Sequence, residues 1–331
     1  HISNRLMNKG WKPTEFTPDG KPKVDESVLS KLDFPEAKLL SEHFLIAKRI
    51  GMLAEGNNAW LKLQQDGKIY GSVITNGANT GRCTHQRPNV AQTPSVSVPY
   101  GKECRSLFTV PDGYVLIGCD ASGLELRCLA HYLGAFDKGS FARELLDGDV
   151  HSKNQKQIGL PSRDMAKRVI YGIIYGIGDT RLGSIVEKTS YEGKRIKAKL
   201  FETIPALKAL RDSVLVKTRN QKYLLGLDKR KLIPRSEHSS LNLLIQSCGA
   251  LIIKMATIIL HKKLEEKNYD KNICSMVAHI HDELQLQCTS DYANEVGAIA
   301  VQSIKDAGTY FNSRCPLDAE FKIGKTWADT H

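Results

Sequence analysis

Residues 275–287, SMVAHIHDELQLQ, constrain the fold of this chain more than any other stretch. A short apolar run ends at Ile280, two adjacent carboxylates follow at Asp282 and Glu283, and leucines then alternate with glutamines. Alternation with a period of two residues is typical of a half-buried strand, so the pattern predicts a strand, a tight turn and a second strand. The turn places anionic side chains at its tip without burying them unpaired. Aspartate is also a common turn former, which is the simpler explanation for this one stretch.

A second acidic strand end lies far upstream, where the apolar strand predicted at residues 115–119 is followed directly by Asp120. If the two strands are neighbours, Asp120 and Asp282 form a site of two carboxylates. Such a pair does not stay ionised cheaply unless a cation lies between the two groups. Mg²⁺ takes oxygen ligands of this kind, and two ions about 3.5–4 Å apart can activate an attacking oxygen and stabilise a leaving one. The alternative is that the two aspartates are unrelated.

The third feature is a predicted helix that starts after Ser162, a typical N-cap residue. Arg163, Lys167, Tyr171 and Tyr175 follow at regular intervals of one helical turn. Because an α-helix has about 3.6 residues per turn, these side chains form a slowly winding stripe that runs from cationic to aromatic. The stripe fits a nucleoside triphosphate lying along the helix, with the cations on phosphate oxygens. The alternative is an amphipathic helix with a solvated basic start and a tyrosine-lined core edge.

Two glycines, Gly172 and Gly176, fall within the same predicted helix. Each costs about 1 kcal/mol relative to alanine in a helix interior. We therefore expect a flat group to approach the helix closely at these positions.

The amino-acid composition limits the classes of protein to which the chain can belong. The chain has 331 residues, 41% hydrophobic and 25% charged, which suits one large globular domain or two or three subdomains. A formal net charge of +11 suits a polyanionic partner such as nucleic acid without requiring one. No apolar run approaches the roughly 20 residues of a membrane span, so we expect no membrane contact. Eight cysteines without a CxxC pair favour reduced thiols and a cytoplasmic location.

The predicted strands lie early and late in the chain, with an all-helical insertion between them, which indicates an α+β fold. Ser122 and Glu125 have the capping-box spacing at the start of one predicted helix. Residues 76–99 form a long irregular stretch, and such a loop in a compact domain is usually functional. A further strand is predicted at residues 69–74, an extended tail at 317–331, and helices at 35–55, 122–133, 241–264 and 292–307, with several more between 137 and 225.

Three ordered stretches carry a family resemblance: DASGLELRCLAHYL at residues 120–133, RDMAKRVIYGIIYGIG at 163–178 and HDE at 281–283. They resemble the signatures of family A, polymerase I-like DNA polymerases, and most closely the branch of phage replicative enzymes. The intervening TGRCTHQRPNVAQTP, GDVHSKNQ and LNLLIQSCGAL fit that branch in the same order. The resemblance covers nearly the whole chain.

The resemblance implies a template-directed DNA polymerase core that adds dNTPs to a primer 3′ end by two-metal-ion phosphoryl transfer. Asp120 and Asp282 would hold two Mg²⁺ ions, with the carbonyl of Ala121 as a further ligand. Glu283 would be a catalytic carboxylate near the site, with a smaller effect.

The resemblance also assigns the nucleotide contacts. Arg163, Lys167 and His151 would bind the incoming triphosphate, and Lys167 would also aid protonation of pyrophosphate. Tyr171 matches the position that governs acceptance of nucleotides lacking a 3′-hydroxyl, and Tyr175 would stack near the templating base.

Further positions match contacts with sugar and DNA. Glu125 matches the steric gate that excludes a 2′-hydroxyl, alongside its expected capping role. Arg82, Asn242 and Gln246 fall where the family contacts primer-template, and His281 would lie close to the primer-terminal nucleotide. Every Watson–Crick pair offers minor-groove acceptors, so Arg and Gln can donate to them without reading sequence.

The implied architecture is a right-hand polymerase core with an antiparallel palm sheet and helical fingers. Its parts would be thumb base and lead-in (1–75), first palm segment (76–135), fingers (136–227) and second palm segment (228–331). The chain begins with His1 rather than methionine, so we expect native sequence before it, including the 3′–5′ exonuclease domain and most of the thumb. Partners would be primer-template DNA, dNTPs, a separate exonuclease or thumb portion and a processivity factor.

Three other functions are compatible with parts of the pattern. A single-subunit RNA polymerase shares an Arg-x-x-x-Lys helix and a His-Asp turn, although Glu125 and the HDE turn favour the DNA enzyme. A metal-dependent phosphoesterase would use His279, His281 and Asp282, and leaves the cationic and aromatic stripe unexplained. A non-catalytic DNA-binding subunit would use the basic charge alone.

Overall fold

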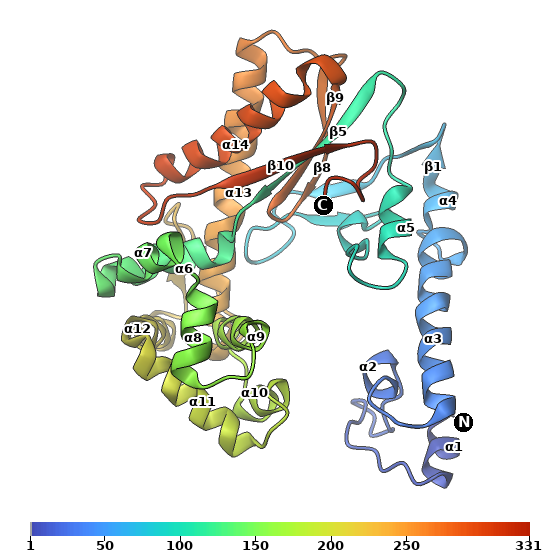
Figure 1. Cartoon of the computed structure of the whole chain (residues 1–331), viewed down its shortest axis with the longest axis vertical. Helices are drawn as coiled ribbons and strands as arrows, with labels where there is room; N and C mark the ends of the chain where they lie inside the picture. The colour runs from blue at the N-terminus through green and yellow to red at the C-terminus, as the bar shows by residue number, and fades with distance from the viewer. Residues whose placement is uncertain (1) are drawn as a thin grey trace. The chain divides into compact units, whose positions relative to one another are not determined.

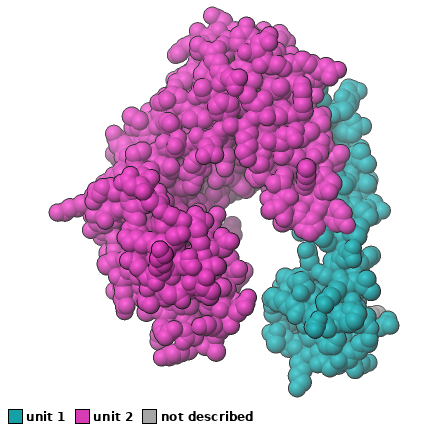
Figure 2. All heavy atoms as spheres, viewed as in Figure 1, with its two compact units in different colours: residues 1–72, 85–90 teal, residues 73–84, 91–331 magenta. Residues whose placement is uncertain are grey.

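The computed structural model describes residues 2–331, which form two compact units. Figure 2 colours them separately: one unit extends to residue 72 and includes residues 85–90, and the other comprises residues 73–84 and 91–331. All the candidate site residues belong to the second unit.

The first unit is mainly helical and has a small core of its own, formed by Leu6, Trp11, Val28, Leu29 and Ala37. Its elements are α1 (Ile2–Asn8), α2 (Glu26–Leu29), α3 (Pro35–Ile50), the π-helical turn η1 (Gly51–Glu55), α4 (Trp60–Leu63), β1 (Gln64–Gln65) and β2 (Lys68–Ile69). The helix predicted at residues 35–55 is confirmed as α3 continued by η1, and it begins with proline at its first position, where no backbone donor is needed.

The strand predicted at residues 69–74 is wrong as a single element, because the chain divides it between β2 and β3 (Ser72–Ile74). The predicted long irregular stretch follows. It contains only β4 (Thr84–Gln86) and the 3₁₀ turn η2 (Val90–Gln92) before α5 (Gly101–Ser106).

A four-stranded antiparallel sheet organises the second unit, in the order β10–β5–β9–β8 (Figure 1). Its strands are β5 (Tyr114–Ala121), β8 (Cys274–Ile280), β9 (Glu283–Thr289) and β10 (Ala319–Gly324). The predicted hairpin is confirmed, with two loop residues between β8 and β9. Ile117, Cys119, Leu284 and Leu286 are fully buried on one face, and because strand side chains alternate, Asp120 and Glu283 share the other face.

Two long helices, α13 (Ser240–Glu266) and α14 (Ala293–Tyr310), pack against each other beside the sheet, and α14 contacts β5 and β10 (Figure 1). By length and composition α13, with the short turn before it, could also cross a membrane. However, 61% of its most apolar window is buried inside the protein, as is usual for a core helix. It forms part of one hydrophobic core that continues from the sheet into the helical insertion.

The predicted helical insertion between the early and late strands is confirmed, which gives the α+β class. It comprises α6 (Leu124–Asp137), α7 (Ser140–Asp147), α8 (Val150–Ile158), α9 (Arg163–Ile174), α10 (Asp179–Ile185), α11 (Ser190–Thr203) and α12 (Pro205–Gln221). The short hairpin β6 (Leu224–Leu225) and β7 (Lys231–Leu232) and the turn η3 (Glu237–Ser239) lead into α13, and η4 (Ser290–Tyr292) precedes α14.

The capping box predicted for Ser122 and Glu125 is wrong. The N-cap of α6 lies one residue later than predicted, at Gly123, which has a left-handed conformation (φ 59°) and forms no side-chain cap. The Ser122 backbone N–H donates instead to the carbonyl oxygen of Asp318, at 2.9 Å. Glu125 is thereby left to interact with other segments.

Replacing Gly297 by alanine should destabilise the fold, although alanine favours helices. A Cβ atom at this position in α14 would lie 2.4 Å from two ring atoms of Phe321 in β10. A contact this short belongs to the upper part of the overpacking range, about 2–3 kcal/mol, and the gain in helix propensity offsets about 1 kcal/mol of it. We expect Gly297→Ala to lower the free energy of unfolding in urea by about 1–2 kcal/mol. Adding Phe321→Leu should recover most of this loss, and a single variant as stable as the parent would contradict the packing.

Candidate active site

The structure brings Asp120 and Asp282 to the same end of the sheet. Asp120 lies near the end of β5, directly opposite Glu283 in β9. Asp282 is the second loop residue of the β8–β9 hairpin, and its carbonyl oxygen accepts the backbone N–H of Ala121 at 3.1 Å. The strand pairing therefore places the two predicted carboxylates on adjacent segments.

Negative charge is crowded at this position. Burial and, to a smaller extent, the charges of Asp282 and Glu283 together raise the pKa of Asp120 to about 6, against an opposing effect of His331. Burial also raises the pKa of Asp282, while Arg82 and His281 act to lower it. The pair therefore holds its second negative charge at a cost that a cation would remove.

The oxygen donors at this position fit a hard divalent cation. Asp120 and Asp282 offer carboxylate oxygens, and Ala121 offers a carbonyl. Within residues 2–331, no cluster of three or more His, Cys, Asp or Glu side chains forms a complete metal cage. Mg²⁺ suits such an incomplete set, because it is usually bound by one or two carboxylates and completes its octahedron with water and substrate phosphates.

Glu283 is on the same face but is buried under the last residues of the chain. Its Oε1 accepts the Trp327 indole N–H at 2.7 Å and the Gln285 amide, and its Oε2 lies 3.2 Å from His331 Nδ1. Burial acts to raise the pKa of Glu283, but these hydrogen bonds outweigh it and the pKa lies below its usual value. This carboxylate is fixed by side chains of the chain itself, which suits support of the hairpin better than metal ligation.

Helix α9 presents the predicted cationic end to solvent. Its N-cap is Ser162, as predicted, with the hydroxyl accepting the Met165 N–H at 3.2 Å. Arg163 and Lys167 are exposed, and Arg163 Nε donates to Asp149 Oδ2 at 2.6 Å. Asp149 also caps α8, and its pKa is held well below the usual value mainly by Arg163.

The aromatic part of the stripe turns toward the sheet. Tyr171 is half-buried between the rings of His151 and Tyr175, with centroid distances of 6.4 and 6.3 Å. Burial and, to a smaller extent, the charges of Glu125 and Asp282 together raise the pKa of Tyr171 to about 12. This segment of α9 is therefore within electrostatic reach of the hairpin carboxylate. Burial lowers the pKa of His151, so its buried imidazole is neutral at pH 7.

A chain of hydrogen bonds joins three predicted residues from separate segments. Tyr175 Oη donates to Glu125 Oε2 at 2.6 Å, and Arg82 Nη2 lies 3.3 Å from Glu125 Oε1. Glu125 projects from the first turn of α6, while Tyr175 is the C-cap of α9. The side chain predicted as a steric gate thus holds a tyrosine and an arginine at once.

The predicted role of the two α9 glycines is not supported by their surroundings. A Cβ atom at Gly172 would contact Ile177 and Ile185 at 3.3–3.6 Å. Gly176 lies beyond the helix with φ +73°, and a Cβ atom there would lie 2.1 Å from the His238 carbonyl oxygen. Both glycines therefore permit close packing within the chain itself, which accounts for them without a flat ligand.

Asn242 and Gln246 lie one turn apart in α13 and are half-buried. Asn242 Oδ1 is buried without a hydrogen-bond partner among residues 2–331. His281 is the first loop residue of the β8–β9 hairpin, exposed and with φ 58°. Together with Arg82, all four residues that the resemblance assigns to DNA are therefore in the unit that contains the carboxylates.

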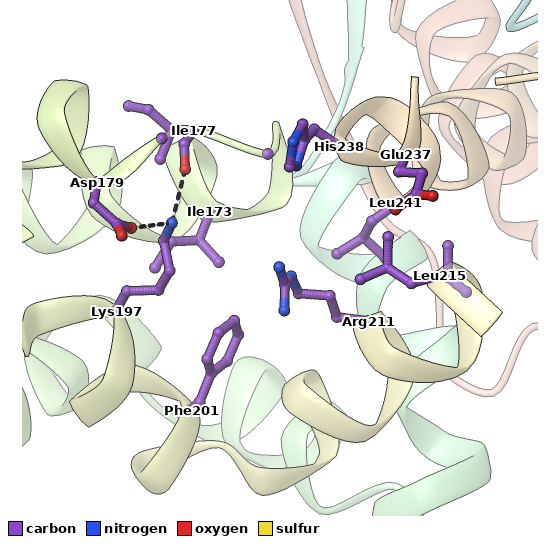
Figure 3. Close-up of a pocket in the computed structure, with 13 residues that line it drawn as sticks. Ile173, Ile177, Asp179, Lys197, Phe201, Arg211, Leu215, Glu237, His238 and Leu241 are labelled. Atoms are coloured by element: carbon purple, nitrogen blue, oxygen red, sulfur yellow. Dashed lines mark hydrogen bonds and ion pairs between the residues drawn. The ribbon is translucent and has the colours of Figure 1, made fainter. Parts of the chain in front are cut away.

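A cavity of about 370 Å³ lies beside the C-terminal end of α9, lined by residues of α9 to α13 (Figure 3). Charged side chains at its edge have partners: Lys197 Nζ contacts Asp179 at 2.5 Å and the Ile177 carbonyl at 2.9 Å, and Glu237 pairs with Arg219. Asp120 and Asp282 do not line it. We regard it as a packing gap beside the α9 helix.

Several residues that shape the site were not predicted. Arg105 stacks on Trp327 at 4.4 Å, donates to the Pro94 carbonyl at 3.0 Å, and lies 4.0 Å from Glu283. Only Asp149 carried a local signal, since aspartate is a typical helix N-cap residue and Asp149 caps α8. The other contacts join segments distant in sequence and leave no periodic pattern.

Without divalent ions, Asp120→Asn should stabilise the folded chain at about pH 7.5. The folded pKa is raised from 3.8 to about 6, so the ionised carboxylate weakens folding above that pH, and the effect disappears below about pH 3, where the carboxyl is protonated in both the folded and the unfolded state. Because Asp120 is partly exposed, we expect a gain of only about 1 kcal/mol. Urea titrations in EDTA at pH 7.5 and at about pH 3 measure this gain in the free energy of unfolding. Glu320→Gln, across the strand pair, is the control, and a less stable Asp120→Asn at pH 7.5 would contradict the account.

Comparison with known proteins identifies the family. Residues 2–329 match the model described as DNA polymerase family A. The DNA-directed DNA polymerases of Enterobacteria phage T3 and Escherichia phage T7 are each 44% identical over 365 residues, covering 100% of this chain and 52% of each relative. The chain thus spans about half the length of these curated relatives.

A solved structure shares the fold. It is the POL domain of Pol1 from M. smegmatis, in complex with DNA primer-template and dNTP, and it matches with a TM-score of 0.84 at 20% identity. The match covers 99% of this chain and 60% of that chain. The predicted resemblance is therefore confirmed: the chain belongs to DNA polymerase family A.

Proposed function

We propose that this chain is the core of a DNA-directed DNA polymerase that adds dNTPs to a primer 3′ end. The observation that carries the proposal is the convergence of Asp120 and Asp282 at one end of the sheet, within electrostatic reach of Tyr171 on α9. Phosphoryl transfer depends mainly on positioning and electrostatic stabilisation, so carboxylates for metal ions and cations for phosphates are the parts it needs.

Asp120, Asp282 and the Ala121 carbonyl would hold two Mg²⁺ ions. When bound, such ions neutralise charge on the attacking and leaving oxygens. The register of β5 and β9 keeps the two carboxylates in place. The contacts of Glu283 with Trp327 and His331 keep the hairpin in that register. Glu283 thus contributes by holding the hairpin.

The α9 stripe would bind the triphosphate. Arg163 already forms a charge-assisted hydrogen bond with Asp149, so a phosphate oxygen would replace that carboxylate at the same guanidinium. Lys167 is exposed one turn further along and would supply the second cation and a proton for pyrophosphate. The neutral imidazole of His151 would contribute a hydrogen bond rather than a charge.

The sugar and base of the nucleotide would contact the tyrosines at the C-terminal end of α9. Tyr171 would contact the 3′ position, and Tyr175 would stack near the templating base once its hydrogen bond to Glu125 opens. Glu125 would exclude a 2′-hydroxyl. Arg82 and Gln246 would donate to minor-groove acceptors, with Asn242 and His281 beside the primer terminus.

We further propose the domain assignment of thumb base and lead-in (1–75), palm (76–135 and 228–331) and fingers (136–227). The fingers would close over the nucleotide, and the cavity behind α9 leaves room for that helix to shift. Primer-template DNA is the proposed main partner, with a separate exonuclease or thumb portion and a processivity factor as further partners. Buried, unpaired cysteines support a reducing, cytoplasmic location.

Replacing either metal-binding aspartate should abolish primer extension. Asp120→Asn and Asp282→Asn each remove a carboxylate worth several kcal/mol in the transition state, so we expect losses of about 10³-fold or more. Primer-template binding should remain, because neither aspartate is assigned to DNA. Extension of a labelled primer and fluorescence anisotropy measure the two properties. Glu320→Gln should stay within about twofold of the parent. Full extension by either aspartate variant at saturating Mg²⁺ would refute the assignment.

Tyr171→Phe should raise discrimination against dideoxynucleotides. Removing the phenolic hydroxyl deletes one hydrogen-bonding group at the 3′ position, worth about tenfold in relative incorporation. Competition between dTTP and ddTTP on one primer-template gives the ratio directly. The same change at the exposed Tyr191 should leave the ratio unaltered. An unchanged ratio in Tyr171→Phe would remove this residue from the role.

A further inference from the structure

Arg230 lies at the turn of the β6–β7 hairpin, and the end of its side chain contacts Gly81, far away in sequence. A Cβ atom at Gly81 would lie 2.5 Å from Arg230 Nη2, 3.0 Å from Nη1 and 3.2 Å from Cζ. The guanidinium group therefore occupies the space beside the Gly81 backbone. Gly81 is buried and has φ +80°, a conformation that disfavours any other residue there.

Arg230 is itself anchored on two sides. Its Nη2 donates to Ser247 Oγ at 3.3 Å, and Ser247 is completely buried in α13. Its backbone N–H donates to Asp228 Oδ1 at 3.1 Å, while its Nε lies 3.7 Å from Asp228 Oδ2. The guanidinium is thus fixed between the hairpin and the long core helix before it meets Gly81.

The segment that Arg230 contacts is a tight turn that ends at Arg82. Gly81 N–H donates to the Ala78 carbonyl at 2.9 Å, Arg82 N–H donates to Thr80 Oγ1 at 3.2 Å, and Ala78 N–H donates to the Arg82 carbonyl at 3.3 Å. The turn fixes the backbone from which the Arg82 side chain reaches Glu125. Displacing Gly81 would therefore displace Arg82.

We propose that Arg230 is a positioning residue that holds the 78–82 turn and thereby aims the Arg82 guanidinium at the primer end. This inference rests on the proposed function, which assigns Arg82 to primer-template. Lysine cannot replace Arg230 in this role, because its ammonium lacks the planar group that contacts Ser247 and fills the space beside Gly81. The charge of Arg230 matters less than its shape.

A double-mutant cycle in primer extension tests the proposal. Arg230→Gln and Arg230→Lys should each lower the rate about tenfold, and the double variant Arg82→Ala with Arg230→Gln should be no slower than Arg82→Ala alone. Lys229→Gln removes a charge from the same turn and serves as the matched control, with a rate within about twofold of the parent. Effects that multiply in the double variant, or a parental rate in Arg230→Lys, would overturn the proposal.

Amide hydrogen exchange in the free protein separates this proposal from the proposed function. Exchange at Gly81 and Arg82 should accelerate about tenfold or more in Arg230→Gln, whether or not the chain extends primers. If the parent chain fails to extend, the polymerase assignment is at fault, and exchange alone decides the role of Arg230. Unchanged exchange in the 78–82 turn would overturn that role even in an active enzyme.

Discussion

The pairing register of β5 against β9 is the constraint on which the rest of the site depends. A slip of one residue would turn every side chain of a strand to the opposite face. Ile117 and Cys119 in β5 and Leu284 and Leu286 in β9 are fully buried on one face, so the hydrophobic core fixes the register. That register sets Asp120 beside the hairpin loop, and the apolar face holds the charged groups together against their mutual repulsion.

Two of the cations that the proposed function requires already have carboxylate partners within the chain. Arg163 pairs with Asp149, and Arg82 with Glu125, which also holds Tyr175. Nucleotide binding would therefore exchange one anion for another at Arg163, and DNA binding would exchange the Glu125 carboxylate for neutral minor-groove acceptors at Arg82. Such an exchange keeps the guanidinium groups oriented before the ligand arrives, which lowers the entropy cost of binding. In contrast, Glu283 is buried, and its carboxylate contacts Trp327, Gln285 and His331 of the chain itself.

Local sequence patterns predicted the helix and the hairpin that hold the candidate site residues. The residues that were not predicted act through contacts between segments distant in sequence. The hairpin at residues 275–287 and the Ser162-capped helix depend on neighbours in sequence, so periodicity and capping residues revealed them. The capping box at Ser122 was a false local signal, because Gly123 adopts a left-handed conformation and Glu125 finds partners in other segments. Arg105, Arg230 and Trp327 each act across large separations in sequence, and no spacing rule indicates such contacts. The roles of the individual site residues remain predictions from the family resemblance and the geometry.

Metal binding measured directly tests the central claim. Mn²⁺ takes the same oxygen ligands as Mg²⁺ and reports its environment by electron paramagnetic resonance. Titrated into the chain with primer-template and a non-hydrolysable dNTP analogue, it should bind as a pair of ions whose spectra broaden each other. Asp120→Asn and Asp282→Asn should each lose that broadening while still binding the DNA. An unaltered two-ion spectrum in both variants would show that the ions lie elsewhere and would contradict the account.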